Sequence, residues 1–203
     1  MTVTYPYPLS WLSDVLRISE ATMRIERQEE TSGAGTGQYW AAELADPLWT
    51  AVVPLSARSS DEARSIDAAL NMLGSNKVML FADPSYEGID ASGVTLSAFN
   101  ADRTAITLSG LASGQVVKRG QRLSVAYGAN VWFAEFGENV MANESGVLGA
   151  VSIYPYPPMT LTVGVEVELA KPFLKMMIAD RSAFTHQPGA FGQGATLTLR
   201  QKP

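Results

Sequence analysis

The chain has 203 residues, enough for one large domain or two small ones, and its 46% hydrophobic content is ample for a buried core. Only 17% of the residues are charged, and 20 acidic against 15 basic residues give a net charge of −5, which argues against nucleic-acid binding by phosphate neutralisation and against binding to an anionic membrane surface. With no cysteine and a single histidine, His186, the chain has no disulfide, thiolate nucleophile or cysteine-ligated zinc, and almost no residues for histidine-based metal or acid–base chemistry.

We expect no secretory signal in the N-terminal region. The first charged residue after Met1 is Asp14, whereas a secretory signal begins with a basic stretch. No apolar run approaches the length of about 18 residues that a membrane-spanning helix needs. We therefore expect a protein that is made in a cytoplasm and does not insert into a membrane. Residues 9–20 indicate one or two helical turns.

Strands are predicted next, because apolar and polar residues alternate with period two from Thr22 to Leu55, with a break at Asp46-Pro47. We expect strands at Thr22–Gln28 and Gln38–Ala45, and a further one after the break. The positions expected to face the core are Met23 and Ile25, then Trp40, Ala42 and Leu44, and then Trp49, Ala51, Val53 and Leu55.

The glycine-rich segment Thr31–Gly37 raises the question of a phosphate-binding loop. It lacks the Gly-Lys-Ser/Thr ending of a Walker loop, and its spacing is not the dinucleotide fingerprint. It also lies between two expected antiparallel strands rather than before a helix. We interpret it as the loop of a β-hairpin.

One amphipathic helix is predicted at about residues 59–73. Ser59 and Glu62 have the spacing of a capping box, and Gly74 is placed to end the helix. The apolar side chains that share one helical face are Ala63, Ile66, Ala69, Leu70 and Leu73. A strand at Lys77–Ala82 follows directly.

The middle of the chain consists of short strands and turns. The clearest alternation runs from Leu161 to Leu169, with valines between polar residues. Similar patterns place Leu123, Val125, Tyr127, Val131, Phe133 and Ile153 on buried faces. Two more strands, Phe173–Ile178 and Thr196–Arg200, follow Lys171-Pro172.

The short strands with regular turns predict a mainly β protein, a β-sandwich or a small barrel, with one amphipathic helix. The change of composition near Asp90 and the boundary at Lys171-Pro172 indicate that residues 91–170 are an insertion between residues 1–90 and residues 171–203. The insertion predicts that the closing strand, Thr196–Arg200, pairs within the sheet of residues 20–82.

Candidate catalytic residues are few. Glu166 and Glu168 share a strand face about 7 Å apart, a separation near that of inverting glycosidases, but they lie on the polar side of an amphipathic strand, where a solvated face is the better interpretation. Glu135 and Glu138 receive the same interpretation. His186 has Ser182 nearby but no Gly-x-Ser-x-Gly elbow, so we interpret it as a loop histidine.

Aromatic residues of the middle region allow two interpretations. They are Trp132, Phe133, Phe136, Tyr154 and Tyr156. They could form a platform on which a sugar stacks, but such residues on alternating strands are more often core or subunit interface. We predict no catalytic, cofactor-binding or metal-binding residue, and a protein that is not an enzyme.

The order of elements resembles a known family. It comprises the strand pair, the segment Leu44–Leu55, the helix Asp61–Leu70 and a strand ending at Phe81-Ala-Asp-Pro84. This order is similar to the belt domain of distal tail proteins of long-tailed bacteriophages and gene-transfer agents. The middle region looks like the small barrel that these proteins often insert, with the segments Gly120–Gly128, Asn143–Gly146, Gly164–Val167 and Lys171–Met176. Ala190–Leu199 looks like the strand that closes the belt.

The resemblance implies a β-sandwich belt domain made of residues 1–90 and 171–203, with residues 91–170 as an inserted small β-barrel. It also implies a structural role. Distal tail proteins form a ring, usually of six, between the tail tube and the hub of the tail tip. The expectation is a homohexameric virion protein of the tail tip, made in the host bacterial cytoplasm, whose partners are itself, the tail tube protein and the tail hub protein, with no sequence-specific nucleic acid. The alternatives are a carbohydrate-binding β-module for host-surface recognition and, third, an acid/base glycosidase.

Overall fold

The computed structural model describes residues 6–11, 16, 18, 20–35, 37–73, 77–185 and 194–203. The chain is mainly β, as predicted, with 49% strand and 10% helix. It divides into two compact units: residues 1–78 with 176–202 form the first, and residues 79–175 form the second. The divisions lie at 78/79 and 175/176, compared with the expected 90/91 and 170/171. The N-terminal part of the chain and the C-terminal stretch 176–202 therefore belong to the same unit.

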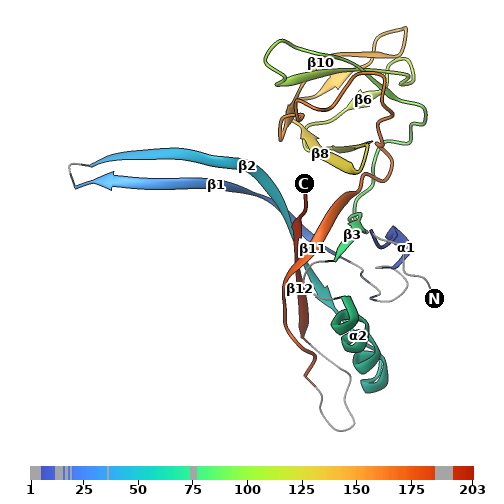
Figure 1. The fold of residues 1–203 in the computed structure, drawn as a ribbon. Helices are drawn as coiled ribbons and strands as arrows, with labels where there is room; N and C mark the ends of the chain where they lie inside the picture. The colour runs from blue at the N-terminus through green and yellow to red at the C-terminus, as the bar shows by residue number, and fades with distance from the viewer. Residues whose placement is uncertain are drawn as a thin grey trace. The chain divides into compact units, whose positions relative to one another are not determined.

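A five-stranded sheet forms the framework of the first unit (Figure 1). Its helices and strands are α1 (Leu9–Trp11), β1 (Thr22–Ala34), β2 (Gln38–Leu55), α2 (Ser60–Leu73), β11 (Leu174–Arg181) and β12 (Ala195–Gln201). One outer strand of the sheet is β3 (Val78–Phe81), and the division between the units falls within β3 and within β11. The strand order is β1-β2-β12-β11-β3. β12 pairs antiparallel with β2, from Ala195 opposite Leu55 to Arg200 opposite Thr50. The expected pairing of the closing strand with the sheet of residues 20–82 is confirmed.

The helix α2 begins with the predicted cap. The Ser59 Oγ accepts the Glu62 N–H at 3.1 Å, and the Glu62 carboxylate accepts the Arg58 N–H at 2.6 Å. Both bonds satisfy backbone donors at the start of the helix. The helix ends at Leu73, and the predicted stop at Gly74 lies outside the described residues.

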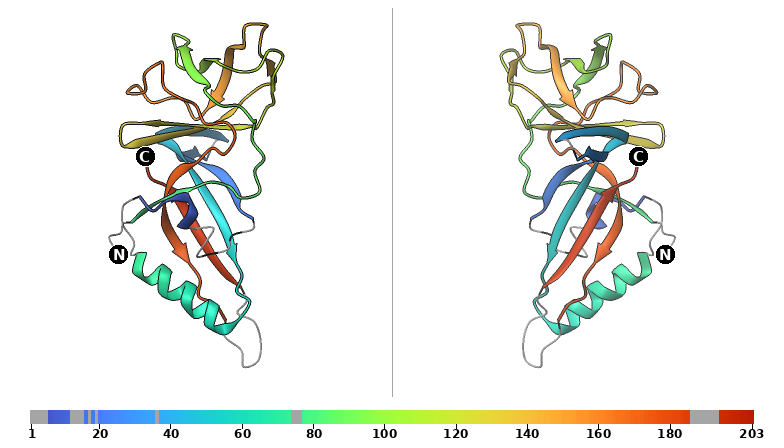
Figure 2. Two further views of the ribbon diagram at one scale, coloured as in Figure 1. Left: turned by 90° about the vertical axis from the view of Figure 1, so that its right-hand side faces the viewer. Right: turned by 90° about the vertical axis from the view of Figure 1, so that its left-hand side faces the viewer.

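The apolar stripe of α2 seats the helix on the sheet. Ala63, Ile66 and Leu70 are buried, and α2 lies on one face of the sheet (Figure 2). The sheet residues predicted to be buried between Trp49 and Leu55 are buried as well. The period-3.6 pattern of the helix and the period-two pattern of β2 thus meet in one core.

Replacing Leu70 by alanine tests this packing. Leu70 is 4% exposed, so the cavity should lower the free energy of unfolding by about 2–5 kcal/mol. Met72 lies on the same helix and is 80% exposed, so Met72→Ala should change that free energy by no more than about 0.5 kcal/mol. Denaturant unfolding of both variants makes the comparison, and equal effects would show that the apolar stripe is misplaced.

The second unit is built on another five-stranded sheet. Its strands are β4 (Thr95–Phe99), β5 (Ala105–Ser109), β6 (Val116–Val117), β7 (Arg122–Tyr127), β8 (Asn130–Phe136), β9 (Val140–Met141) and β10 (Val147–Tyr154). The order is β4-β5-β10-β8-β7, and β6 and β9 form a separate two-stranded sheet. Leu96, Ile106, Leu123 and Leu148 are fully buried in the core of this unit.

The segment from Leu161 to Leu169 corrects one expectation. It is not a regular strand, although the sequence alternation is clearest there; it makes only single bridges, Thr95 with Glu166 and Ser124 with Glu168. These bridges join it to β4 and β7, the two edges of the sheet, and so close the sheet into a barrel. Gly164, at φ 85°, lies in a turn inside this segment and interrupts any continuous strand.

The two connections that enter and leave the barrel meet at Gly88. The Ile89 N–H donates to the Leu169 carbonyl at 3.0 Å. A Cβ atom at Gly88 would overlap the carbonyl oxygens of Leu169 and Ala170. Beside this crossing, Asp83 forms a largely buried ion pair with Arg122 at 2.8 Å. The ends of the inserted barrel are therefore held together by backbone contact.

Gly88→Ala tests this crossing. Because the new methyl group meets backbone rather than a movable side chain, we expect the free energy of unfolding to fall by about 1–3 kcal/mol. Gly149 is the matched control, since a Cβ there meets no atom within 4 Å and its φ is ordinary, so Gly149→Ala should be nearly neutral. Thermal unfolding of the two variants separates the outcomes; a neutral Gly88→Ala would contradict the close approach.

Candidate functional site

The β1–β2 hairpin extends well beyond the sheet to which it belongs. β12 pairs with β2 only between Thr50 and Leu55, whereas β1 and β2 remain paired as far as Ala34 opposite Gln38. We call the free two-stranded part, residues 28–34 with 38–45, the arm (Figure 1). At 3.3 Å per residue, the seven residues of its first strand span roughly 20 Å.

A pair of register shifts marks where the arm leaves the sheet. They fall between Glu26 and Gln28 and between Gln28 and Glu29, and at each of them β2 advances by one residue more than β1. Such bulges bend and twist a ribbon. The arm leaves on the side of the sheet opposite α2 (Figure 1). The bend therefore directs the arm away from the helix-covered core.

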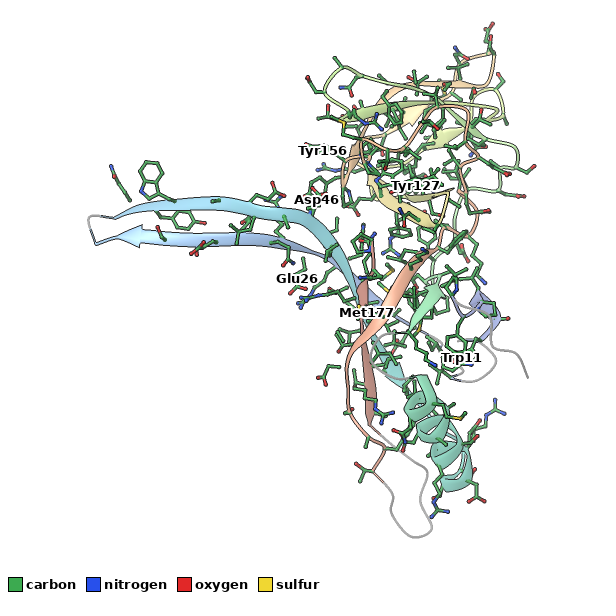
Figure 3. All side chains as sticks on the ribbon, in the orientation of Figure 1. Trp11, Glu26, Asp46, Tyr127, Tyr156 and Met177 are labelled. Carbon is green, nitrogen blue, oxygen red and sulfur yellow. The ribbon has the colours of Figure 1, made fainter. Side chains whose placement is uncertain are left out.

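The arm corrects the predicted burial of its strands. Tyr39, Trp40 and Leu44 are 71%, 68% and 68% exposed, and the side chains stand free on both faces (Figure 3). The sequence predicted a buried face for Trp40, Ala42 and Leu44, and that prediction is wrong. The alternation is present, but no second layer of the described chain covers either face.

The interpretation of Thr31–Gly37 as part of a hairpin is confirmed, but the loop is shorter than expected. β1 continues to Ala34 and β2 begins at Gln38, so only three residues separate the two strands. Gly37, at φ 84°, supplies the left-handed conformation that such a turn requires.

Each face of the arm carries one aromatic residue beside a small one. Tyr39 lies directly opposite Gly33, and Trp40 directly opposite Ser32. Directly opposed residues of an antiparallel pair point to the same side, and successive residues to opposite sides. Each face of the ribbon therefore presents an aromatic ring that projects beside a small residue. This arrangement suits insertion of the ring into another surface.

The arm also carries unbalanced negative charge. Glu29 lies directly opposite Glu43, and like charges at such positions destabilise a ribbon. Glu29 forms an ion pair with Arg27 at 3.3 Å. Glu43 and Glu30 form no ion pair with any described residue. The carboxylates of the arm are thus in excess over its cations.

These features are typical of a surface that becomes buried in a complex. A two-stranded hairpin alone in water is marginally stable. Tyrosine and tryptophan are enriched where proteins contact one another, and exposed groups of large apolar side chains mark such places. The arm is the strongest candidate interaction site in the described part of the chain.

The glutamates considered for catalysis have structural surroundings. Glu168 Oε1 accepts the N–H groups of Ala170 and Lys171 at 3.0 and 2.8 Å, and its own backbone bridges to Ser124. Glu166 bridges to Thr95 on the barrel edge and is exposed. The Glu168 carboxylate therefore stabilises the turn that follows it, which is a structural role.

Glu135 and Glu138 differ in their environments. Burial raises the pKa of Glu135 above its ordinary value, against the opposing positive charges of Arg122 and Arg119. The pKa of Glu138 is lowered because its carboxylate accepts both the N–H and the hydroxyl of Ser152, each at 2.8 Å. Glu138 therefore joins the turn that follows β8 to strand β10.

Of the histidine and its neighbouring serine, the structure describes only Ser182. His186 lies outside the described residues. The Ser182 hydroxyl oxygen accepts the Thr196 N–H at 2.8 Å and so ties the end of β11 to β12. This contact with the backbone accounts for the serine at position 182.

The aromatic residues of the second unit are mostly core. Trp132, Phe133 and Phe136 are buried, and the Trp132 indole donates to the Pro155 carbonyl at 3.2 Å. Tyr154 meets Tyr156 edge to face at 5.6 Å, and Tyr156 is exposed. These five residues therefore form no continuous open platform for a sugar.

Within the described ranges, no three His, Asp or Glu side chains gather in a way that could hold a metal ion. Over the same residues, no helix has the length and apolar character needed to cross a bilayer. Compared with known proteins, the chain matches no protein-family model and no curated protein.

The raised pKa of Glu135 predicts a pH-dependent effect of Glu135→Gln. A carboxyl group whose pKa rises on folding costs stability above that pKa and costs nothing at a pH below its unfolded value, where both states are protonated. The substitution should therefore raise the melting temperature at pH 7 and have little effect near pH 3.5. Calorimetry at the two pH values tests this, and a melting temperature lowered at pH 7 would show that attraction to Arg122 outweighs burial.

Proposed function

We propose that the protein is a structural subunit of a ring in a phage-like tail tip, where it joins the tail tube to the hub. The single observation that carries the proposal is the arm, whose two exposed faces need a partner. A mainly β chain made of a sheet unit and a barrel unit agrees with the architecture that the resemblance to distal tail proteins implies.

The arm supports self-assembly for a geometric reason. An arm that leaves its own sheet can contact a different surface of another copy, and we propose that this contact is head-to-tail rather than a reciprocal exchange between two copies. Head-to-tail contacts repeat until they close into a ring or continue as a filament. A homohexameric ring is the closed form that we propose here.

The proposed role requires no catalysis, cofactor or metal. The partners are further copies of the chain, the tail tube protein and the tail hub protein, and the location is the tail tip of a virion made in a bacterial cytoplasm. The structural roles of Glu168, Glu138 and Ser182 support this proposal, because each of these groups holds a turn or a strand end.

Removing the arm tests the proposal. Residues 29–44 are replaced by Asn-Gly, which joins the register partners Gln28 and Ala45 by a two-residue turn. Sedimentation velocity and electron microscopy of the full chain should show a ring of six copies, and the armless variant should be monomeric with a melting temperature close to that of the parent.

Met159→Ser is the control, since Met159 is exposed on the second unit and should leave assembly unchanged. A parent chain that stays monomeric throughout the micromolar range would contradict the proposed function. So would an armless variant that assembles as well as the parent.

A further inference from the structure

The segment that leads into the barrel is folded on itself and contains neither helix nor strand. It comprises residues 83–87, which follow β3 and precede the crossing at Gly88, and we call it the strap. The Asp83 carbonyl accepts the Tyr86 N–H at 3.3 Å. Asp83 Oδ1 accepts the N–H and the hydroxyl of Ser85 at 3.0 and 2.6 Å. These bonds shape the strap internally and do not attach it to the barrel.

Arg122, the first residue of β7, holds the strap on the barrel. Its Nη1 donates to Asp83 Oδ2 at 2.8 Å, and both side chains are largely buried. The Tyr86 hydroxyl accepts the Arg122 N–H at 2.6 Å, and the guanidinium lies 5.2 Å from the centre of the Tyr86 ring. In the part of the chain that the structure describes, the hydrogen bonds and ion pairs that join the strap to the rest of the second unit all involve Arg122. The attachment of the strap therefore depends on one residue.

The segment that leaves the barrel is held at more points. Two residues further along β7, Ser124 exchanges backbone hydrogen bonds with Glu168 at 3.0 and 2.8 Å, and its hydroxyl accepts the Phe173 N–H at 3.1 Å. The Lys175 ammonium donates to the Ala129 carbonyl in the turn after β7. Segments with fewer contacts open at a lower free energy. The strap is therefore the connection that opens first.

A second carboxylate lies beside Arg122. Glu135 of β8 is directly opposite Arg122, and Tyr154 of β10 is directly opposite Glu135 on its other side. Directly opposed side chains of an antiparallel pair lie on one face, with Cβ atoms about 5 Å apart. Burial raises the pKa of Glu135, although Arg122 and Arg119 both attract its charge. Arg122 thus lies between one carboxylate on the strap and one on the barrel.

This arrangement supplies two states. In the closed state, which the structure shows, Arg122 binds Asp83. When the strap lifts, Asp83 enters water, and the Arg122 guanidinium can turn to Glu135. A largely buried charge left without a partner is strongly destabilising. The second carboxylate removes this cost and so makes opening of the strap alone accessible.

We propose that the strap is released as a unit while the barrel stays folded, by exchange of Arg122 from Asp83 to Glu135. The backbone contact at Gly88 keeps the barrel closed in both states. The five released residues can extend to about 17 Å, which frees the connection that enters the barrel. The inference goes beyond the proposed function and does not depend on ring assembly.

Hydrogen exchange of the full chain tests the release. The Arg122 N–H is covered by the Tyr86 hydroxyl and reports on the strap. The Phe136 N–H is bonded to the Gln121 carbonyl at 2.8 Å and reports on the barrel. Mass spectrometry with fragmentation to single amides, corrected for intrinsic rates, should show Arg122 exchanging at least about tenfold faster than Phe136. Equal rates would mean that the strap opens only with the barrel and would overturn the inference.

Two substitutions test the two carboxylates. Asp83→Asn keeps an acceptor for Ser85 and removes the charge, so exchange at Arg122 should rise about tenfold with no change at Phe136. Glu135→Gln removes the second partner of Arg122, so exchange at Arg122 should slow about threefold. Asp102→Asn is the matched control, because Asp102 is exposed in the turn between β4 and β5, and it should change neither rate.

The pair of amides separates release from general destabilisation. An Asp83→Asn variant in which the Arg122 and Phe136 rates rise equally would show that the ion pair stabilises the whole barrel, which overturns release of the strap. Unchanged or faster exchange at Arg122 in Glu135→Gln would overturn the exchange of partners. Each outcome is independent of the oligomeric state, so it leaves the proposed function standing.

Discussion

The pairing of β12 with β2 is the constraint on which the rest of the structure depends. It joins residues 195–200 to residues 50–55, and it places Leu197 and Leu199 in the core that α2 covers. Because the closing strand returns to the N-terminal sheet, the chain between them must leave and come back. The contact of Gly88 with Leu169 and Ala170 is where the two passes meet. A sheet closed by its own C-terminus and a barrel with adjoining ends follow from this one pairing.

The same pairing explains why there is an arm. β12 covers β2 only as far as Thr50, and the remainder of β2 has β1 as its one strand neighbour among the described elements. A ribbon of two strands buries neither face and gains little beyond its own hydrogen bonds. Exposure of the Tyr39 and Trp40 rings to water makes the folded arm less stable in the isolated chain. The stability of the arm therefore depends on what it contacts, and this dependence is the reason why the arm points to a role in assembly.

Polar groups elsewhere in the chain mostly fix the backbone. Glu168 caps the turn after the barrel-closing segment, Glu138 binds the β10 backbone, and Ser182 ties the end of β11 to β12. Each group is occupied by backbone donors, which is how side-chain oxygens stabilise turns and strand ends. On the arm, by contrast, Glu30 and Glu43 form no ion pair with any described residue, and both faces of this ribbon are uncovered.

Much of the fold was determined by local sequence. The Ser59–Glu62 cap, the stripe through Ile66 and Leu70, and the alternation from Trp49 to Leu55 each act over a few residues, so a single sequence predicts them. The change of composition near Asp90 and the boundary at Lys171-Pro172 indicated an insertion, and the insertion predicted the pairing of the closing strand. Only the tertiary structure decided which of the alternating segments are covered by another strand or helix. The pattern through Trp40 reads like that through Val53, yet one is exposed and the other buried, because burial depends on β12 and α2 arriving from elsewhere in the chain. Likewise, residues 161–169 alternate like a strand but make only single bridges, since their partners β4 and β7 are set by barrel closure rather than by local pattern.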